Sequence, residues 1–431
     1  MNLQDSVRPR QIDFLIELYA KALACADPMK VVPPHLPALP RGRTVVVGVG
    51  KAAAAMALAV ETHWPGPLEG VVVVPEGAAL STARIRVHEA SHPVPDERSL
   101  AGARLLMTAV EGLEADDLVI ALISGGGSAL CALPAPGLAL ADKQRLTREL
   151  LKRGATIAEI NTVRRHLSAF KGGRLAAHAH PARVVTLVIS DIPGDDPALV
   201  ASGPTLPDAS TCADALALLR RYGLADVPEV RHALASGAWE SVKPDDWRLA
   251  GHSHRLIASA WDGLAAAAKQ ARVNGLACHI LSDAMEGEAR ELAKGHAAIA
   301  LSVARRGTPF QAPCVILSGG EATVTVRGGG RGGRNTEFAL ALLMSLEGQA
   351  GSHRIHALSA GTDGLDGLAG AAGAWVAPDF PGRMRALGLD PRAHLDANDS
   401  APVLDALGAL FHTGATYTNI NDFRAMLVEA E

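Results

Sequence analysis

The sequence is poor in cysteine, in aromatic residues and in long apolar runs, and each shortage excludes a class of protein. Its five cysteines are widely separated and form no CxxC pair, which argues against a disulfide framework or a structural zinc site and favours a reducing compartment. No run of 18 apolar residues occurs, and the opening string MNLQDSVRPR contains no apolar signal core. The sequence therefore predicts a cytoplasmic protein that has no membrane partner.

An excess of charge of one sign is also lacking. The chain has 41 basic and 45 acidic residues, a net charge of −4 at pH 7, so no strong field attracts nucleic acid or anionic lipid. Only nine of the basic residues are lysines, so a lysine that occurs within a candidate motif is more informative than it would be in a lysine-rich chain. With 431 residues, 48% of them hydrophobic, the chain can bury a full core and is long enough for more than one domain.

Several well-known catalytic motifs are missing. There is no G-x-x-x-x-G-K-[ST] string, which excludes an ordinary P-loop, and no HExxH or other metal spacing among the 16 histidines. A nucleophile elbow is excluded because Ser128 is followed by Ala129 and Leu130.

What is present is a repeated alternation of an apolar strand, a polar or glycine-rich loop and a helix. The pattern predicts a doubly wound α/β fold with a mostly parallel sheet. Between residues 222 and 248 the alternation is lost, which places a boundary near residue 245 and predicts domains 1–245 and 246–431. The predicted strands are 44–47, 71–74, 118–123, 184–189, 255–259, 278–281, 314–317 and 355–358.

The loops after the first and third of these strands carry glycines in patterns that bind phosphate. Open α/β sheets bind ligands at the carboxyl ends of their strands. Gly48, Gly50 and Ala53 match the dinucleotide fingerprint G-x-G-x-x-A, with Glu76 after the next strand, whereas Lys51 favours direct contact with a phosphate. The second loop has three glycines between two hydroxyls and predicts a backbone nest for phosphate; its residues are Ser124, Gly125, Gly126, Gly127 and Ser128.

Two other loops contain clustered aspartates, Asp191, Asp195 and Asp196 in one and Asp363 and Asp366 in the other. Carboxylates at strand ends beside phosphate nests suit a hard cation such as Mg2+, and one of them can instead accept the proton of a substrate hydroxyl. Turn-forming and helix-capping roles are the alternative for each of them.

The stretch from Leu317 to Leu340 combines a strand, a turn, a glycine–arginine segment and a helix. Gly319 and Gly320 form the turn, and Glu321 after them is either a metal ligand or an exposed edge charge. The segment RGGGRGGR ends at Arg334, and a helical pattern begins at Asn335. Glycine backbone, guanidinium forks and a helix N-terminus together predict a site for a multiply charged anion.

Further polar candidates lie outside these five loops. Asn161, Arg164 and Arg165 fall on one face of a predicted helix, and His166 beside them is more often structural than catalytic. The segments Ser91-His92-Pro93 and Lys171-Gly172-Gly173-Arg174 complete the group.

Two glycine nests, one in each predicted domain, together with basic residues and carboxylates indicate an anion-rich ligand in a cleft between the domains. Phosphoryl transfer from a metal–nucleotide complex is the leading chemistry, because it needs positioning and charge neutralisation more than covalent help. Hydride transfer with a nicotinamide cofactor and a non-enzymatic nucleotide-binding module are the alternatives. The paired aspartates favour the first over the second.

Five strings in the chain resemble the glycerate 2-kinases of the MOFRL type, over roughly residues 10 to 428. They are SGGGSAL, EINTVRRHLSAFKGGRLA, SDIPGDDPALVASGPT, GGRNTEFALA and SAGTDGLDG. The resemblance implies an N-terminal Rossmann-like domain, a smaller C-terminal α/β domain and an active site in the interdomain cleft. It also implies ATP, a divalent cation and phosphorylation of glycerate at the 2-hydroxyl, although members are often labelled hydroxypyruvate reductases.

The site expected from the loops and the resemblance has three parts. Lys51 and Arg334 take the catalytic weight that the family gives to the matching lysine and arginine, and Asp191 joins them as a candidate base. ATP is assigned to Gly48, Gly50, the loop from Ser124 to Ser128, Gly319, Gly320 and Asn335, and the metal to Asp195, Glu321, Asp363 and Asp366. Glycerate and ATP are the expected partners, nucleic acid is not, and a homodimer is left open.

One departure from the family pattern lies near the C-terminus. The chain reads TGATYTNINDF from Thr413 to Phe423, where the family string is close to TGPTGTNVNDL, so Tyr417 replaces a glycine. A tyrosine does not copy a glycine that needs a positive φ or a close ligand approach.

Overall fold

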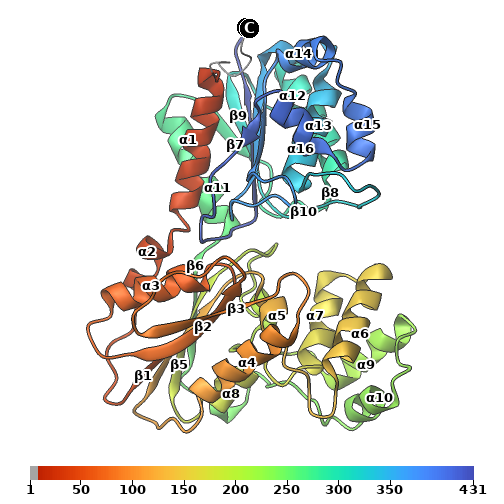
Figure 1. Cartoon of the computed structure of the whole chain (residues 1–431). Coiled ribbons are helices and arrows are strands. Elements are labelled where there is room, and N and C mark those ends of the chain that lie inside the picture. Colours follow the sequence, from red (N-terminus) through yellow and green to blue (C-terminus); the bar gives the residue numbers. More distant parts are fainter. Residues whose placement is uncertain (1–7) are drawn as a thin grey trace. The chain divides into compact units, whose positions relative to one another are not determined.

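The computed structural model describes residues 8–431, which form two compact units that each contain a six-stranded sheet (Figure 1). The N-terminal unit comprises residues 28–190 and 195–257. The C-terminal unit comprises the chain up to Asp27, residues 191–194 and residues 258–431. These units differ from the predicted domains 1–245 and 246–431, because the segment after residue 245 adds an edge strand to the first sheet.

The sheet of the N-terminal unit has the strand order β3-β2-β1-β4-β5-β6. β1 runs parallel to β2 and β4, β2 is parallel to β3, and β4 is parallel to β5. This is the order of a doubly wound dinucleotide-binding sheet, whose topological switch point lies between β1 and β4. The strands are β1 (Thr44–Val49), β2 (Glu69–Pro75), β3 (Ile85–Ala90), β4 (Leu118–Ile123), β5 (Arg183–Ile189) and β6 (Ser253–Ala258).

The helices of this unit fall into two groups. Helices α3 and α4 pack on the sheet, whereas α6, α7, α9 and α10 form a helical cluster with an apolar core of its own, yellow and green in Figure 1. The bounds are α2 (Pro28–Val31), α3 (Ala53–His63), α4 (Glu97–Ala109), α5 (Gly127–Leu130), α6 (Leu140–Lys152), α7 (Ile157–His166), α8 (Arg174–His178), α9 (Cys212–Arg221) and α10 (Pro228–Ala235), with short 3-10 turns η1 (Pro33–His35), η2 (Val200–Ser202) and η3 (Trp247–Leu249).

The sheet of the C-terminal unit is mixed and has the order β13-β12-β11-β14-β9-β7. β7 and β9 are parallel, while β14 is antiparallel to both β9 and β11, and β12 is antiparallel to β11 and β13. The strands are β7 (Ala277–Ile280), β9 (Cys314–Ser318), β11 (Ile355–Gly361), β12 (Gly373–Val376), β13 (Leu410–Phe411) and β14 (Asp422–Val428), and a separate pair joins β8 (Gly287–Glu288) to β10 (Ala322–Thr323).

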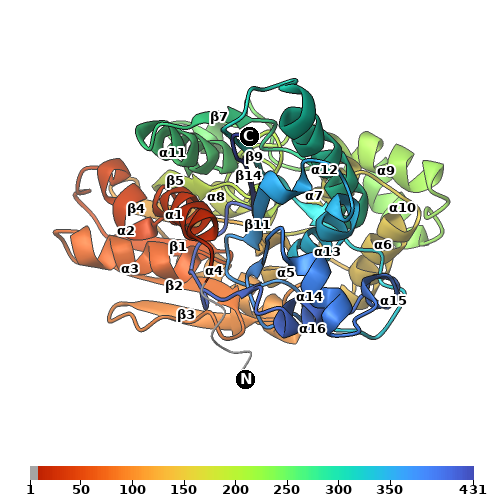
Figure 2. The ribbon, with the colours of Figure 1, turned by 90° about the horizontal axis from the view of Figure 1, so that it is seen from above.

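Helices cover both faces of this mixed sheet (Figures 1 and 2). α1 and α11 contact strands from one face, and α12 and α13 contact them from the other. The helices are α1 (Arg10–Ala24), α11 (Ala260–Val273), α12 (Ala289–Arg306), α13 (Arg334–Leu346), α14 (Phe380–Ala386), α15 (Pro391–Asp396) and α16 (Ser400–Ala406), with η4 (Ser352–Arg354).

Helix α1 belongs to the C-terminal unit although it opens the described chain. Its buried side chains Ile12, Leu15 and Leu18 join the apolar core formed by the mixed sheet. The Tyr19 hydroxyl donates a hydrogen bond to the carbonyl oxygen of Gly361, at the end of β11, over 3.0 Å. In the sequence, the spacing of Ile12, Leu15 and Leu18 predicts a helix over this segment, but helical spacing alone does not say which sheet the helix covers.

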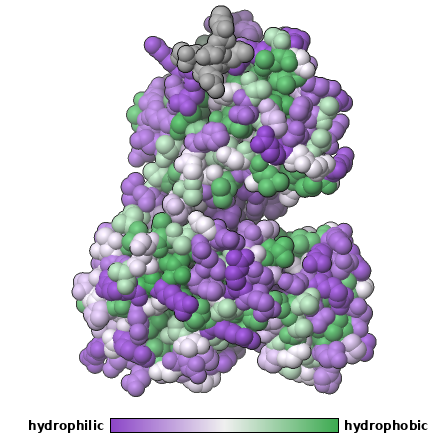
Figure 3. All heavy atoms as spheres, viewed as in Figure 1, coloured by the Kyte–Doolittle hydropathy of each residue, from purple (hydrophilic) through white to green (hydrophobic). Residues whose placement is uncertain are grey.

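Hydrophilic residues cover much of the visible face of each unit (Figure 3). Among residues 8–431, no helix combines the length and the apolar composition needed to cross a bilayer.

Candidate active site

In the N-terminal unit, the loops after β1 and β4 are bonded to each other at the switch point of the sheet. The N–H of Lys51 donates to the carbonyl of Gly125 over 2.9 Å, and the N–H of Ala52 donates to the Ser124 hydroxyl over 3.0 Å. Gly50 has φ 131°, and a Cβ at this position would lie 2.2 Å from the Ser124 hydroxyl oxygen. Only glycine therefore lets the two loops approach this closely.

The loop after β4 presents a row of unused backbone donors. In the described chain, the N–H groups of Gly125, Gly126, Gly127 and Ser128 donate to no protein acceptor. Gly125 and Gly127 are buried, and buried N–H groups normally find a partner. A cradle of consecutive N–H groups at the start of a short helix is suited to phosphate oxygens.

Lys51 and His92 border this cradle. A Cβ built on Gly126 would lie 3.4 Å from Cγ of Lys51 and 3.2 Å from Nε2 of His92. The two side chains therefore lie beside the residue that turns the loop, whose φ is 80°. The structure thus brings together Gly48, Gly50, Lys51 and the segment from Ser124 to Ser128, as expected for the carboxyl ends of neighbouring strands.

A third loop of the same unit contacts the cradle at Ser128. Ala201 and Ser202 have φ values of 53° and 62°, a region that residues with a side chain rarely adopt. The Ser202 hydroxyl lies 2.7 Å from the Ser128 hydroxyl and donates to Oδ1 of Asn161 over 3.1 Å. Strained backbone of this kind is typical of functional sites. Ser202 could not be identified as a site residue from the sequence, because the residue type does not reveal that its φ is positive.

The acidic partner that a dinucleotide fingerprint requires has another role here. Glu76 is exposed and bonds to Nη1 of Arg98 over 3.0 Å. In a dinucleotide-binding fold, the acidic residue after the second strand normally keeps its carboxylate oxygens available to accept hydrogen bonds from the ribose hydroxyls. The exposed ion pair of Glu76 gives the nicotinamide alternative no support.

In the C-terminal unit, Arg334 lies at the start of α13 and is held by two carboxylates. Its Nε donates to Oδ1 of Asp422 over 2.8 Å, and its Nη1 bonds to Glu321 over 2.5 Å. Asp422 is fully buried, and its other oxygen bonds to Arg424 over 2.6 Å. Two guanidinium groups thus share one buried carboxylate.

Burial and charge act in opposite directions on this cluster. Burial by itself would lower the pKa of Arg334 and raise that of Asp422, because it disfavours the charged form of each group. The two carboxylates raise the pKa of Arg334 overall, and the two arginines lower the pKa of Asp422 overall. The cluster therefore stays charged, with Arg334 about a quarter exposed and able to meet an anion.

The turn before Arg334 is packed against protein backbone. A Cβ on Gly320, whose φ is 105°, would lie 2.2 Å from the nitrogen of Met285. The N–H of Gly319 donates to the carbonyl of Ser282 over 2.8 Å. Gly319 and Gly320 thus have a structural reason to be glycine that the sequence did not reveal.

The glycine–arginine segment and the N-terminus of α13 also differ from the expected bare anion site. The N–H groups of Arg327 and Gly328 donate to the Asn398 side chain, and that of Arg331 donates to Asp399. Asp366 fills the helix N-terminus, where it accepts from the N–H groups of Asn335 and Thr336 over 2.9 and 2.8 Å. Asn335 was predicted to bind ATP and Asp366 to bind the metal, and in the structure the two residues are hydrogen-bonded to each other.

The remaining carboxylates lie in two groups. Asp191 accepts from Nδ2 of Asn419 over 3.0 Å, and Oδ1 of Asn419 lies 3.5 Å from the hydroxyl of Thr362, next to Asp363. Asn419 therefore connects the Asp191 and Asp363 loops within the C-terminal unit. Asp195 and Asp196 belong to the N-terminal unit, where Asp196 accepts the N–H of Ala198 over 2.9 Å.

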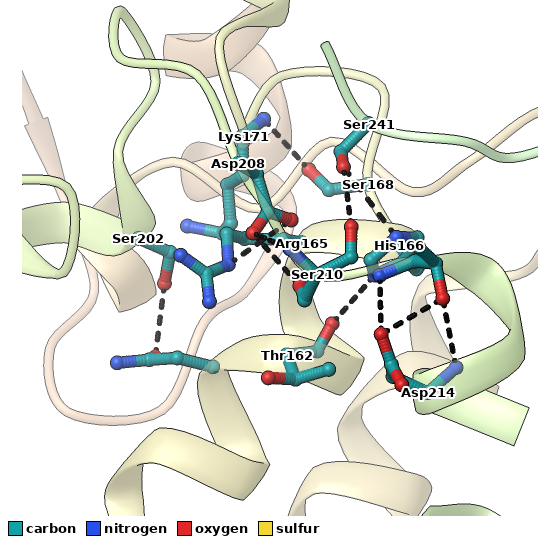
Figure 4. Close-up of polar contacts among 12 residues, drawn as sticks. Thr162, Arg165, His166, Ser168, Lys171, Ser202, Asp208, Ser210, Asp214 and Ser241 are labelled. Carbon is teal, nitrogen blue, oxygen red and sulfur yellow. Dashed lines mark hydrogen bonds and ion pairs between the residues drawn. The ribbon is translucent and has the colours of Figure 1, made fainter. Parts of the chain in front are cut away.

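His166, Cys212 and Glu240 come close enough for one metal ion, but their contacts explain them without one. The imidazole lies 3.0 Å from Glu240, and Glu240 is also paired with Lys243 over 2.7 Å. Burial, followed by the charge of Glu240, raises the pKa of the Cys212 thiol to about 11, which opposes the thiolate that a metal needs. Figure 4 shows His166 in a dense polar network, as the sequence analysis expected of a structural histidine.

Sequence reasoning missed Arg424 and gave Asp422 no role beyond its retention in the string that departs from the family at Tyr417. Both residues are almost fully buried, and they sit at the start of β14, paired with the ends of β9 and β11. The available signal in the sequence was the pair of opposite charges at Asp422 and Arg424, because side chains two residues apart point to the same face of a strand.

Comparison with known proteins covers almost the whole chain. Residues 14–235 match the family described as "Domain of unknown function (DUF4147)", and residues 314–422 match the MOFRL family. The chain is 51% identical to a protein of Agrobacterium vitis named putative hydroxypyruvate reductase, over 98% of this chain and 95% of that one.

Two further similarities come from Thermotoga maritima. Its D-glycerate 2-kinase is 39% identical to this chain, over 94% of this chain and 96% of the relative. A crystal structure of glycerate kinase from this organism superposes with a TM-score of 0.86 at 39% identity and covers 97% of this chain and 100% of that one.

Proposed function

Since the chain belongs to the glycerate kinase family marked by the DUF4147 and MOFRL domains, we propose that it transfers a phosphoryl group from ATP to the 2-hydroxyl of glycerate. The product is 2-phosphoglycerate. The observation that supports this most directly is the cradle of four unused N–H groups from Gly125 to Ser128, next to Lys51. Phosphoryl transfer needs such fixed donors, because its catalysis rests mainly on positioning and on neutralising charge.

The proposed roles follow the surroundings of each residue. The cradle and Lys51 hold phosphate oxygens of ATP, since the backbone donors and the ammonium are positioned for anions. Arg334 supplies a second cation, which its two carboxylates keep charged and in a fixed orientation.

For the divalent cation, carboxylates with oxygens not consumed by helix capping are the suitable ligands. Asp366 accepts hydrogen bonds at the N-terminus of α13, and Glu321 is ion-paired with Arg334, so both carboxylates already have a role within the C-terminal unit. Asp191 and Asp363 fit better, because both are carboxylates in loops that Asn419 connects. One of the two would hold Mg2+, which when bound would screen the charge of the phosphates. The other would serve as the base for the substrate hydroxyl.

A hydroxypyruvate reductase is the second candidate, because a protein 51% identical to this chain carries that name as a putative one. A dehydrogenase would place an acidic residue on the ribose, and Glu76 is instead ion-paired with Arg98. It would also have no evident need for Arg334 and its pair of carboxylates.

The two candidates separate in one experiment with the purified full-length protein. Racemic glycerate with ATP and Mg2+ should yield ADP and a phosphate ester at the 2-position, and addition of a chelator should stop the reaction. Hydroxypyruvate should cause no oxidation of NADH or NADPH above background. Steady oxidation of NADH, with no ADP formed from glycerate, would refute the kinase proposal and establish the reductase.

A further inference from the structure

A small cavity in the N-terminal unit borders the phosphate cradle at Ser128. Its volume is about 170 Å³, and its wall is formed by the segments around Pro93, Ser128, α6 and α7 together with Lys171. Ser128 belongs both to the cradle and to the cavity wall. The ammonium of Lys171 donates to the carbonyl oxygen of Ser128 over 3.0 Å, so the cavity and the cradle share a bonded boundary.

The charged residues in the cavity wall all have the same sign. Lys143, Arg148, Arg164 and Lys171 line it, and no aspartate or glutamate is among its lining residues. The rest of the wall includes apolar groups from Pro93, Ala129 and Ala132. In a chain whose net charge is negative, four basic residues around one small cavity form a local excess of positive charge.

The hydrogen bonds of these cations leave capacity for an anion. Lys143 is 5% exposed, and its ammonium bonds to the carbonyls of Leu167 at 3.0 Å and Leu133 at 3.5 Å. Lys171 is fully buried. Within the described residues, the guanidinium of Arg164 forms neither a hydrogen bond nor an ion pair, although it carries five N–H donors.

Buried positive charge without a negative partner is costly, and the titration of these groups reflects this cost. Burial lowers the pKa of Lys171 to about 7; Cys131 opposes this shift and Arg164 adds to it. Burial also lowers the pKa of Lys143 well below its usual value, with Lys171 and Arg164 contributing in the same direction. An anion bound among these groups would remove the cost.

We propose that this cavity binds the carboxylate of the acceptor substrate, a small 2-hydroxy acid, with Arg164 and Lys171 as its principal partners. This inference rests on the proposed function and deepens it, because it names the subsite that recognises the acid. The carboxylate interacts with the guanidinium fork and the ammonium, and the apolar wall contacts the short carbon chain. The 2-hydroxyl is then directed toward Ser128 and the cradle.

A carboxylate explains the cavity better than a phosphate does. The unused backbone donors, which suit phosphate, belong to the loop from Gly125 to Ser128, whereas the cavity offers side-chain cations and an apolar surface. A planar group that accepts two parallel bonds matches an arginine fork. A substrate with a charged end and a neutral carbon chain uses both parts of the wall.

The test is equilibrium binding to the full-length protein at pH 7, measured by calorimetry for wild type and for Arg164→Gln. The variant should fold normally, because Arg164 makes no hydrogen bond or ion pair with the described residues that its loss would leave unpaired. Racemic glycerate should bind at least about tenfold more weakly to the variant, since a hydrogen bond to a charged group is removed. Affinity for ATP with Mg2+ should change by less than about twofold. Arg164→Lys should recover part of the loss.

Lys152→Gln is the matched control, because this exposed lysine lies on α6 outside the cavity wall. Glycerate should bind this variant as it binds wild type, and glycerol, which lacks the carboxylate, should bind neither. Unchanged glycerate affinity in Arg164→Gln would overturn the proposal. Weakened binding of ATP or of inorganic phosphate, with glycerate binding intact, would also overturn it and make the cavity a phosphate subsite. Glycerate binding that depends on Arg164 without any formation of ADP would refute the kinase function while upholding the carboxylate site.

Discussion

Lys51 is the side chain on which the proposed transfer depends most directly. It follows Gly50, the residue directly after β1, and its backbone and side chain both border the loop of Gly126. We expect Lys51→Ala to lower turnover by about two orders of magnitude or more, the effect of losing one preorganised group of about 3 kcal/mol. Steady-state kinetics with the thermal midpoint measured in parallel gives the answer. A folded variant that turns over at a near-normal rate would show that Lys51 has only a structural or surface role.

A second prediction concerns Arg334, where the planar shape of the guanidinium should matter more than its positive charge. In Arg334→Lys the compact ammonium cannot bridge Asp422 and Glu321 as the guanidinium does. Activity should fall more than about tenfold, while the fold survives because Asp422 keeps its bonds to Arg424 and Asn335. If lysine restores more than about half of the activity, then a point charge is sufficient and the argument from the fork fails.

The stability of the fold should depend on pH through Lys171, and the direction of this dependence follows from the lowered pKa of Lys171. The pKa is about 7 in the folded protein and near its ordinary value of 10.5 in the unfolded chain. Between these values the unfolded chain binds more protons, so the contribution of Lys171 to stability rises with pH by up to about 1.4 kcal/mol per pH unit. Cys131, whose pKa burial raises to about 12, contributes in the opposite direction above its ordinary value of 9.

The measurement compares wild type with Lys171→Met between pH 7 and 9 by chemical denaturation. As the pH rises over this range, the free energy of unfolding of wild type should increase relative to that of the variant. Because Lys143, Arg164 and Cys131 are present in both proteins, the difference reports on Lys171. The affinity for glycerate should fall over the same range, because deprotonation of Lys171 removes a positive charge from the cavity. A stability difference between wild type and variant that does not change with pH would mean that Lys171 keeps its ordinary pKa.

At the scale of single elements, Asp366 shows how a helix N-terminus can be closed by the protein itself. It accepts hydrogen bonds from the N–H groups of Asn335 and Thr336 and from the Thr336 hydroxyl. We expect Asp366→Asn to lose about 2 kcal/mol of stability. The NH2 group of the new asparagine cannot accept the hydrogen bonds that the carboxylate oxygen accepts from the backbone N–H groups and the Thr336 hydroxyl. The concentration of Mg2+ that gives half-maximal activity should stay the same. Asp396→Asn, at an exposed carboxylate, is the control, and a raised Mg2+ requirement in Asp366→Asn alone would restore its role as a metal ligand.

The elements that the sequence predicted well are those with an uninterrupted apolar pattern. The predicted strand 118–123 coincides with β4, all of whose residues are buried. Strand β3 was not predicted, because its exposed and half-buried residues include Arg86 and His88, which break the apolar run. In the sequence, apolar and polar residues alternate from Ala322 to Val326, a pattern typical of a strand, yet only the two residues of β10 form one. The segment after β10 bonds instead to side chains such as Glu288 and Asn398.

The candidate site was predictable where function depends on a local string and not where it depends on distant contacts. Gly48 lies near the end of β1, Gly50 follows β1, and the loop from Ser124 to Ser128 follows β4, so the pairing of β1 with β4 brings them together. Asp422 reaches Arg334 across 88 residues of chain, which no local pattern encodes. Tyr417 adopts φ 57°, so a tyrosine does occupy the left-handed backbone region at the position where the family string has glycine.

For the whole molecule, the proposed function predicts which cofactor stabilises the fold. ATP with Mg2+ at 100 times its dissociation constant should stabilise the native state by about 2.7 kcal/mol, a shift in the unfolding midpoint of roughly 3 °C for a cooperative unit of this size. NADH and NADPH at the same concentration should shift the midpoint much less, because Glu76 is engaged by Arg98. Differential scanning fluorimetry of wild type measures both shifts. An equal or larger shift with NADH would favour the reductase instead.

Helix α1 imposes an order of events on the making of this protein. Synthesis runs from the N-terminus, so α1 is made before the whole N-terminal unit, whereas the strands it covers, β11 and β14, are made after that unit. Meanwhile its apolar face, with Ile12, Leu15 and Leu18, has no sheet to bury it. The N-terminal unit can fold in that interval, whereas the C-terminal unit is completed only when β11 and β14 reach α1. The apolar face of α1 therefore stays unburied for at least as long as the N-terminal unit takes to be translated.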